Sequence, residues 1–204
     1  ECPSNVDMAK LKYDFLDRYH KANGRELRHW MLGNISLLGK VGSFFAPVSN
    51  WAARSQGARE ALERAVGVDR RRTLPQFASQ TFAQWFRARG GSPPENATRG
   101  PVLLLPDTFT NYNHPHLGRA ATTLLERMGY QVVLPEVRCC GRPMFANGMM
   151  DKARRNARHN VDTVLPHIRE GAKLVGLEPS CLMSYRDEYE DLLGNDSGAR
   201  AIAD

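Results

Sequence analysis

The second half of the chain carries three short runs of apolar residues, separated by two longer amphipathic stretches, and this pattern constrains the fold most. The runs cover residues 101–105, 131–134 and 173–177. Continuous apolar runs of this length are typical of strands that are buried on both faces of a parallel sheet. A helix is the usual connection between neighbouring parallel strands. The sequence therefore predicts an α/β fold, with a Rossmann-like parallel βαβαβ unit in residues 101–204.

The first half of the chain is predicted to be helical. Apolar residues recur at helical spacing over Met8–His20, and Ser4 or Asn5 can cap the start of this helix. Two further helical stretches are expected over residues 26–38 and 52–66. We therefore expect a helical N-terminal segment before the sheet.

A linker is expected between the two halves. Residues 87–100 are rich in glycine, proline and polar side chains and poor in apolar groups, which is typical of a segment without regular structure. Residues 1–86 would then form the helical segment, and residues 101–204 would form the α/β domain.

The composition excludes several classes of protein. Of the 204 residues 42% are apolar and 25% are charged, as in a soluble globular protein and unlike a disordered or fibrous one. No stretch approaches the roughly 18 consecutive apolar residues of a membrane span, and the first residues lack the pattern of a signal peptide. We therefore expect a cytoplasmic protein without a transmembrane segment.

The net charge of +6 comes largely from arginine and includes the run Arg70-Arg71-Arg72. No nucleic-acid-binding motif and no aromatic stacking pattern accompanies these side chains. We therefore expect no nucleic-acid partner. The basic residues are interpreted as a solvated face or as a contact with an acidic neighbouring domain.

Large apolar residues gather between Trp30 and Trp51, with few charges among them. Such a segment can contact a membrane surface, which would place the protein peripherally at the inner membrane. Apolar helices that dock on a neighbouring domain give the same pattern more often. Both interpretations stay open from the sequence.

Three of the four cysteines follow predicted strands. Cys139 and Cys140 come after the second apolar run, and Cys181 comes after the third. Because ligands of parallel sheets bind beyond the carboxyl ends of the strands, where separate loops converge, these cysteines should meet in space. Clustered thiolates bind iron–sulfur centres, zinc or other soft metals. The sequence therefore predicts a metal or redox site at this edge.

The loops around these cysteines resemble those of a known family. Three stretches carry the resemblance: Pro106-Asp107-Thr108-Phe109-Thr110-Asn111-Tyr112, Cys139-Cys140-Gly141-Arg142-Pro143 and Leu177-Glu178-Pro179-Ser180-Cys181. They resemble the cysteine-rich CCG domain of heterodisulfide reductase subunits and of the iron–sulfur subunits of glycolate, lactate and glycerol-3-phosphate oxidising enzymes. Within that family they look most like the single-chain FAD-binding and iron–sulfur-binding dehydrogenases, which include D-2-hydroxyglutarate and D-lactate dehydrogenases.

The first residues fit the same family. Glu1-Cys2-Pro3 is similar to the end of the ferredoxin motif C-x2-C-x2-C-x3-C-P, whose last cysteine ligates the other cluster in two-cluster ferredoxins. The resemblance implies a flavin domain and a ferredoxin-like segment before this chain, and a second CCG repeat after it. It implies that Cys2 is a ligand of a ferredoxin-type cluster whose other ligands precede this chain. It also implies that Cys139, Cys140 and Cys181 bind a 4Fe–4S cluster that residues outside the chain complete.

Two positions depart from the family pattern. The general CCG pattern has cysteines where this chain has Thr108 and Ser184. Only three thiols are then left around the CCG turn, and three thiolates do not make the usual four-cysteine cluster site. His114 and His116 offer a fourth ligand, so a zinc-bound module remains a second interpretation, together with a metal-free interaction module.

The expected function follows from the resemblance. The intact protein would oxidise a 2-hydroxy acid of the D-2-hydroxyglutarate, D-lactate or glycolate type at FAD, and this region would relay electrons toward a quinone or another carrier. Nothing in the 204 residues resembles a flavin site. We therefore expect no catalytic residue in this chain.

Overall fold

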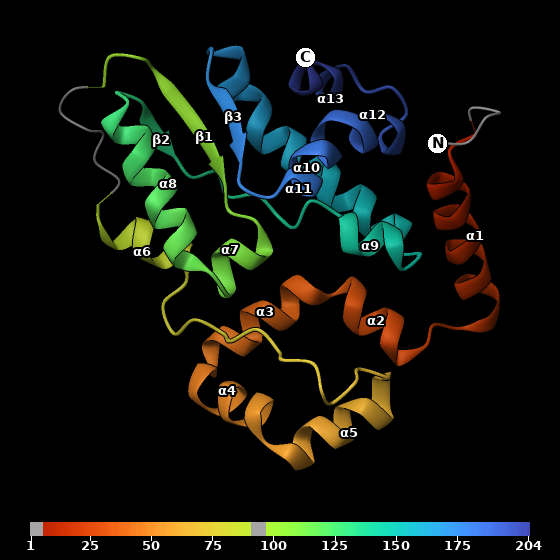
Figure 1. Ribbon diagram of the computed structural model, residues 1–204. Coiled ribbons are helices and arrows are strands. Elements are labelled where there is room, and N and C mark those ends of the chain that lie inside the picture. The colour runs from red at the N-terminus through yellow and green to blue at the C-terminus, as the bar shows by residue number, and fades with distance from the viewer. Residues whose placement is uncertain (1–5, 91–96) are drawn as a thin grey trace.

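The computed structural model describes residues 6–90 and 97–204, and it shows a mostly helical chain around a small parallel sheet (Figure 1). The sheet consists of β1 (Pro101–Leu105), β2 (Gln131–Val133) and β3 (Lys173–Gly176). The strand order is β2-β1-β3, and both pairs are parallel. Val102 lies opposite Val132 on one side and opposite Lys173 on the other. The predicted α/β class is confirmed.

Helices form both crossovers and the C-terminal end of the chain. The first crossover contains α7 (Thr108–Tyr112) and α8 (Pro115–Arg127), and the second contains α9 (Arg142–Ala146) and α10 (Met150–Arg169). After β3 follow α11 (Pro179–Met183), a π-helical turn (Ser184–Glu188), α12 (Tyr189–Leu192) and α13 (Ser197–Ala203). Figure 1 shows α8 on one side of the sheet and α10 with the last helices on the other.

The central strand β1 divides the core into two parts, because successive side chains of a strand point to opposite faces. Leu103 and Leu105 pack with α9, α10 and the C-terminal helices. Val102 and Leu104 pack with the phenylalanines of α6 (Phe82–Ala88) and with β2. Burial on both faces explains why the first apolar run has no polar residue.

The N-terminal helices form a layer of their own, which consists of α1 (Met8–Asn23), α2 (Leu27–Gly33), α3 (Ile35–Phe44), α4 (Ala46–Arg54) and α5 (Gln56–Val66). In Figure 1 α2 to α5 lie below the sheet, whereas α1 lies at the right and contacts α9 and α10. α2 contacts α9 and α3 contacts α7. Since α7 and α9 follow the carboxyl ends of β1 and β2, this helical layer lies against the edge of the sheet where the cysteine loops gather.

The two helices expected over residues 26–38 and 52–66 are each divided in the structure. Asn34 separates α2 from α3, and its Nδ2 donates to the Trp30 carbonyl at 2.7 Å. Ser55, in an extended conformation, separates α4 from α5. An asparagine side chain competes with the helical ladder for backbone groups, and apolar spacing does not register this competition. Gly67 ends α5 in the left-handed conformation, as expected.

Helix α1 begins at the predicted residue but is capped differently. The Asp7 carboxylate accepts hydrogen bonds from the N–H groups of Ala9 and Lys10. Ser4 and Asn5, the predicted caps, lie outside the described residues. Most apolar side chains of this helix are exposed, whereas Asp17 and His20 are buried and Tyr13 packs against Phe145 of the core. The helix therefore docks on the molecule through polar groups and one aromatic ring.

Helix α6 runs through the expected start of the linker at residue 87. Thr81 caps this helix and forms a reciprocal capping box with Gln84. Phe82 and Phe86 are buried in the core on one face of the sheet. Residues 91–96 of the expected linker lie outside the described residues, and the division into domains stays a prediction.

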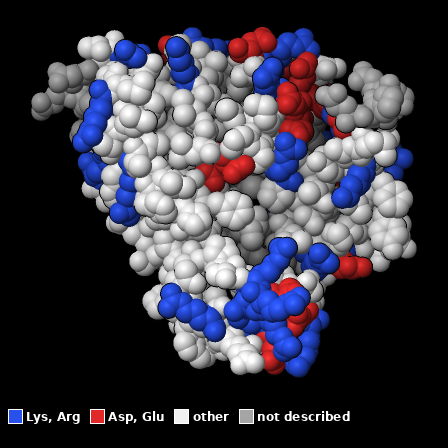
Figure 2. All heavy atoms as spheres, viewed as in Figure 1, with Lys and Arg blue, Asp and Glu red and all other residues white. Residues whose placement is uncertain are grey.

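The basic run of the sequence is neutralised locally. Arg70 lies 3.1 Å from Glu60 and 3.5 Å from Glu63, and Arg71 lies 2.7 Å from Asp69. Figure 2 shows basic and acidic side chains mixed at the lower end of the molecule. This mixture is typical of a solvated face, and the expectation of no nucleic-acid partner stays a prediction.

None of the helices in the described part of the chain is long and apolar enough to cross a bilayer.

Candidate functional site

Three cysteines from two loops meet at the carboxyl edge of the sheet. Cys139 and Cys140 lie between β2 and α9, and Cys181 lies in α11, directly after β3. The Cys140 thiol donates to the Cys181 sulfur at 3.1 Å, and Cys139 is hydrogen-bonded to Cys140. All three are free thiols. Their predicted convergence is found, whereas their role as ligands stays a prediction, and Cys2 lies outside the described residues.

Sterics explain why position 141 of the CCG turn is a glycine. Gly141 adopts φ 99° and ψ −14°, a left-handed conformation that residues with a Cβ rarely adopt. A Cβ at this position would lie 2.9 Å from Cζ of Phe145, a side chain of the buried core. The carbonyl of Gly141 then accepts from the N–H groups of Met144 and Phe145, which starts α9. The turn therefore needs glycine, and the residue before it, Cys140, contacts Cys181 of α11.

Two asparagines of α10 form hydrogen bonds with the backbone of Arg138 and Cys139, at the start of the CCG turn. Asn160 accepts from the N–H of Arg138 at 2.7 Å and donates to its carbonyl at 3.1 Å. Asn156, one turn earlier, donates to the carbonyl of Cys139 at 3.1 Å. Both side chains are buried. The sequence patterns did not reveal them, although their spacing of four places them on the buried face of α10 with its alanines.

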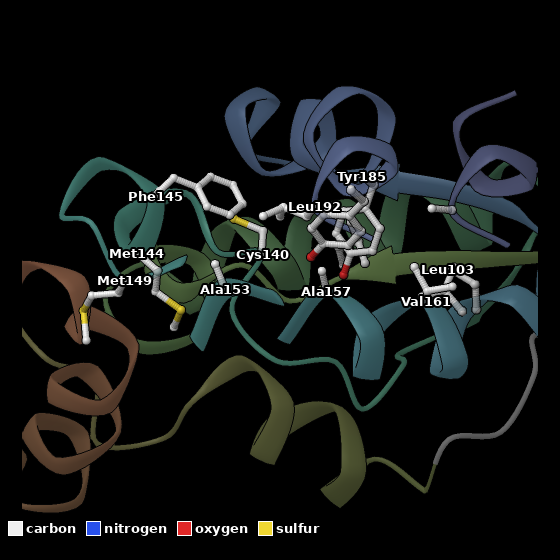
Figure 3. Packing of buried hydrophobic residues seen from close by; sticks show 14 of the residues in the cluster. Leu103, Cys140, Met144, Phe145, Met149, Ala153, Ala157, Val161, Tyr185 and Leu192 are labelled. Atoms are coloured by element: carbon white, nitrogen blue, oxygen red, sulfur yellow. The ribbon is translucent and has the colours of Figure 1, made fainter. Parts of the chain in front are cut away.

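A pair of buried tyrosines closes the inner side of the site. The rings of Tyr185 and Tyr189 lie 4.6 Å apart, and the Tyr189 hydroxyl accepts from Asn160 at 2.8 Å. Burial raises the pKa of Tyr185, and the neighbouring cysteines reinforce this effect. Figure 3 shows Cys140 between Phe145 and the tyrosine side, within the core cluster. The thiols therefore lie against an apolar, water-excluding floor.

The environment of Cys139 and Cys140 favours the protonated form of these two thiols. The hydrogen bond with Cys140, together with burial, raises the pKa of Cys139 far above its usual range. For Cys140 the bond with Cys139 lowers the pKa, but the bond with Cys181 and burial raise it to about 12. Since the thiolate is the form that binds metals, any metal at this site must displace these protons.

Hydroxyl groups occupy the two positions at which the CCG pattern has cysteines. The Thr108 side chain is hydrogen-bonded to Cys139. Ser184 is completely buried, and its hydroxyl donates to the Ser180 carbonyl at 3.1 Å. Thr108 therefore takes part in the thiol cluster, while the hydroxyl of Ser184 bonds within its own helical turn.

The thiol cluster does not form a complete metal site by itself. Among residues 6–90 and 97–204, no group of three or more His, Cys, Asp or Glu is arranged to hold a metal ion. A cavity of about 20 Å³, room for roughly one water molecule, adjoins the three thiols and Thr108. His114 and His116 do not line this cavity. The described residues therefore fit neither a complete 4Fe–4S site nor the zinc site with a histidine ligand.

An ion pair ties the CCG turn to the C-terminal helices. The Arg142 guanidinium lies 2.5 Å from Glu188. Burial raises the pKa of Glu188, although Arg142 opposes this shift. Arg119 instead bonds to Gln80 at 2.8 Å and stacks over Trp85, so it takes no part in the site. The pair therefore couples the position of the Cys139-Cys140 loop to that of the helices after β3.

A larger cavity separates the helical layer from the cysteine loops. Its volume is about 1360 Å³, and the hollow is visible in Figure 2. Its wall includes the basic side chains of Lys40, Arg138 and Lys152, the apolar side chains of α3, and Cys139. Cys139 also lines the small cavity of the thiol cluster. The cluster therefore has one side toward this hollow and one side toward the core.

Comparisons with known proteins agree with this geometry. Residues 108–186 match the cysteine-rich domain CCG. The C subunit of the anaerobic glycerol-3-phosphate dehydrogenase of Escherichia coli (strain K12) is 33% identical over 194 residues, which cover 94% of this chain and 47% of that protein. D-2-hydroxyglutarate dehydrogenase of Pantoea ananatis is 26% identical over 211 residues, 97% of this chain and 20% of that protein. No solved structure matches the chain significantly.

A shorter match covers about half of the chain. Lactate utilization protein A of Exiguobacterium sp. is 34% identical over 96 residues, which cover 47% of this chain and 36% of that protein. The chain spans about half the length of the glycerol-3-phosphate dehydrogenase relatives and a fifth of the D-2-hydroxyglutarate dehydrogenases. The chain therefore contains a cysteine-rich CCG domain and is homologous to these dehydrogenase proteins and to lactate utilization protein A.

Proposed function

We propose that this chain is the iron–sulfur electron-transfer region of a FAD-dependent dehydrogenase that oxidises a 2-hydroxy acid of the D-2-hydroxyglutarate, D-lactate or glycolate type. One observation carries the proposal: three free thiols converge inside a CCG domain, in a chain homologous to dehydrogenases. In this proposal the oxidation step takes place at FAD, outside this chain. Its role in the proposal is electron relay toward a quinone or another carrier.

In this proposal Cys139, Cys140 and Cys181 are ligands of a 4Fe–4S cluster, and Cys2 is a ligand of a ferredoxin-type cluster. The three thiols do not complete a site within the described residues, so the missing ligands would come from elsewhere in the intact enzyme. FAD belongs to another part of that enzyme. The expected partners are a flavin domain, a ferredoxin-like segment and a second CCG repeat.

An apolar patch on α3 and α4 supports docking of this region on another part of the enzyme. Its large side chains are exposed: Leu37, Val41, Phe44, Phe45, Val48 and Trp51. Single exposed apolar residues are ordinary, but a contiguous group of them usually marks an interaction surface. A cytoplasmic protein that touches the membrane only peripherally is the alternative. Co-sedimentation with anionic vesicles, lost in Phe44→Ser, would favour the membrane.

The test is metal analysis of the whole gene product that contains this chain, purified without oxygen. We expect iron and acid-labile sulfide, with a paramagnetic signal after reduction that weakens in the Cys140→Ser variant. Flavin should be present in the same preparation, and a 2-hydroxy acid should reduce it. Stoichiometric zinc without iron would contradict the relay role of the CCG domain.

A second function, a zinc-bound or metal-free interaction module, is favoured by one pair of observations. Thr108 and Ser184 replace two cysteines of the CCG pattern, and the hydroxyl of each is already bonded within the protein. In this case the CCG loops serve only to hold the shape of a docking surface. The Cys140→Ser variant separates the two functions, because in a zinc-bound or metal-free module this substitution would leave the iron content and the paramagnetic signal of the whole gene product unchanged.

A further inference from the structure

We propose that Cys140 and Cys181 form a reversible disulfide, so that the thiol cluster is a dithiol–disulfide couple. The proposal concerns the chain without metal and stands independently of the electron-transfer role. It starts from the mismatch between the thiol cluster and a complete metal site.

The distance between the two sulfurs carries the proposal. Two thiolates on one tetrahedral metal, each about 2.3 Å from it, lie about 3.8 Å apart. The sulfurs of Cys140 and Cys181 are closer than that, at 3.1 Å, and they are in direct hydrogen-bonded contact. A disulfide needs a separation of about 2.05 Å, so the sulfurs must approach by about 1 Å. Small rotations about the Cα–Cβ bonds of the two side chains produce such a movement.

The choice of partner follows from the backbone. Consecutive Cα atoms are about 3.8 Å apart, whereas the Cα atoms of disulfides are usually about 4.4–6.8 Å apart. Cys139 and Cys140 are therefore poorly placed to join each other. Cys139 is instead hydrogen-bonded to Thr108 and to Cys140. Cys181, which comes from a separate loop, is the partner that Cys140 contacts directly.

The difference in burial sets the order of the reaction. Cys181 is partly exposed, whereas Cys140 is buried with 5% of its surface accessible. A small disulfide such as oxidised glutathione therefore meets Cys181 first. The Cys181 thiolate attacks one sulfur of this oxidant, forms a mixed disulfide and releases one glutathione thiolate, which takes up a proton.

The second step closes the bond inside the protein. Cys140 gives its proton to solvent and attacks the sulfur of Cys181, and the second glutathione leaves as a thiolate that is protonated in turn. The two protein thiols are oxidised by two electrons, and oxidised glutathione is reduced to two glutathione molecules. Because the attacking sulfur is already in contact with its target, this step is intramolecular and needs no rearrangement of the loops.

The experiment uses the chain with Cys2→Ser, which removes the thiol outside the described residues. The reduced protein, treated with a chelator, is incubated with mixtures of reduced and oxidised glutathione and is then digested with trypsin. Trypsin does not cleave between Arg142 and Pro143, so Cys139 and Cys140 stay together in peptide 139–152, and Cys181 falls in peptide 174–186. We expect these two peptides to be joined, and dithiothreitol to separate them.

Matched variants identify the bond. The joined peptides should persist in Cys139→Ser and should be absent in Cys140→Ser and Cys181→Ser. A circular dichroism spectrum checks that each variant folds. Because Cys181 is partly exposed and Cys140 is buried, Cys181→Ser should disturb the core less than Cys140→Ser. The proposal is overturned if oxidation yields only glutathione adducts, if no joined peptide forms, or if Cys139→Ser abolishes it. Iron content of the anaerobic preparation is a separate readout, so the failure of either proposal can be recognised alone.

Discussion

At the residue scale, Thr108 is the side chain that separates this site from a four-thiol site. Its hydroxyl is bonded to Cys139, within the cluster that Cys140 and Cys181 complete. In Thr108→Cys a fourth thiol would join the cluster, and four cysteines form a closed tetrahedral zinc site. We expect the variant to bind zinc at least about tenfold more tightly than the parent, a gain of about 1.4 kcal/mol. Competition with a chromophoric chelator measures this change.

The control for this substitution is Thr110→Cys. Thr110 lies in the same short helix and is buried, but it does not line the cavity of the thiol cluster. A thiol there adds a cysteine to the chain without adding one to the site. Equal zinc affinity in the two variants would show that Thr108 is not the missing ligand position.

Gly141 offers a second test at this scale. In Gly141→Ala the residue keeps a left-handed φ of 99°, and its Cβ meets Phe145 at 2.9 Å. Backbone strain costs about 1 kcal/mol, and overpacking of a buried ring costs about 1–3 kcal/mol more. Gly171→Ala is the matched control, because its φ is 90° and its Cβ has no neighbour within 4 Å. Urea unfolding should show a clearly larger loss for Gly141, and equal losses would contradict the role of the Phe145 contact.

Part of the site could be predicted at the residue scale, and part could not. The approach of Cys140 and Cys181 follows from topology, since parallel strands deliver their loops to one edge. The contacts of Asn156 and Asn160 do not follow from it, because they depend on the rotation of α10 about its axis relative to the loop. Nor does the local sequence give the direction in which a loop side chain points, and His114 and His116 do not line the cavity of the thiol cluster.

At the scale of secondary structure, one close contact fixes how α6 and α8 pack. A Cβ on Gly118 of α8 would lie 2.6 Å from the buried ring of Phe82. We expect Gly118→Ala to lower the free energy of unfolding by about 1–3 kcal/mol, because the ring has to move. Gly57→Ala in α5 has open space around its Cβ and should instead raise it by about 0.5–1 kcal/mol through helix propensity. Thermal unfolding of both variants measures the sign of the change in the free energy of unfolding. A stabilising Gly118→Ala would contradict the close packing.

The same contact explains what the apolar pattern of α8 did not reveal. Large apolar residues of this helix are exposed, among them Leu117 and Leu124, while Gly118 and Thr122 are buried. The helix turns Gly118 and Thr122 inward, with Ala121 and Leu125 packed partly against the same core, so residue size alone does not identify the buried face. In α10 the buried residues include the small and branched apolar ones, so the apolar pattern and the buried face agree.

At the scale of the whole molecule, polar contacts attach the helical layer to the CCG domain. Arg25 donates to the carbonyl of Gly148 at 2.7 Å, and Nδ1 of His29 donates to Asn147 at 3.0 Å. The N–H of Met150 donates to Asp17 at 3.3 Å. Sequence patterns indicate which residues are buried but not which segment covers them, and here the covering groups combine these polar side chains with glycines that pack closely on Met149 and Tyr112. The position of this layer against the cysteine loops could therefore not be predicted.

The attachment of the helical layer should depend on pH through His20. Burial lowers the pKa of His20, the nearby His29 and Arg25 add to this effect, and its Nδ1 is buried without a hydrogen-bond partner among the described residues. The folded state therefore favours the neutral ring, and the free energy of unfolding should be fully retained above about pH 6.5 and fall below it. Because a single group takes up one proton, the free energy of unfolding can change by at most about 1.4 kcal/mol per pH unit. His20→Gln should flatten urea unfolding curves measured from about pH 7.5 to about pH 5, whereas His116→Gln, at an exposed position, should keep the slope. An unchanged slope in His20→Gln would assign the pH dependence to other groups, and the polar attachment would then be insensitive to His20.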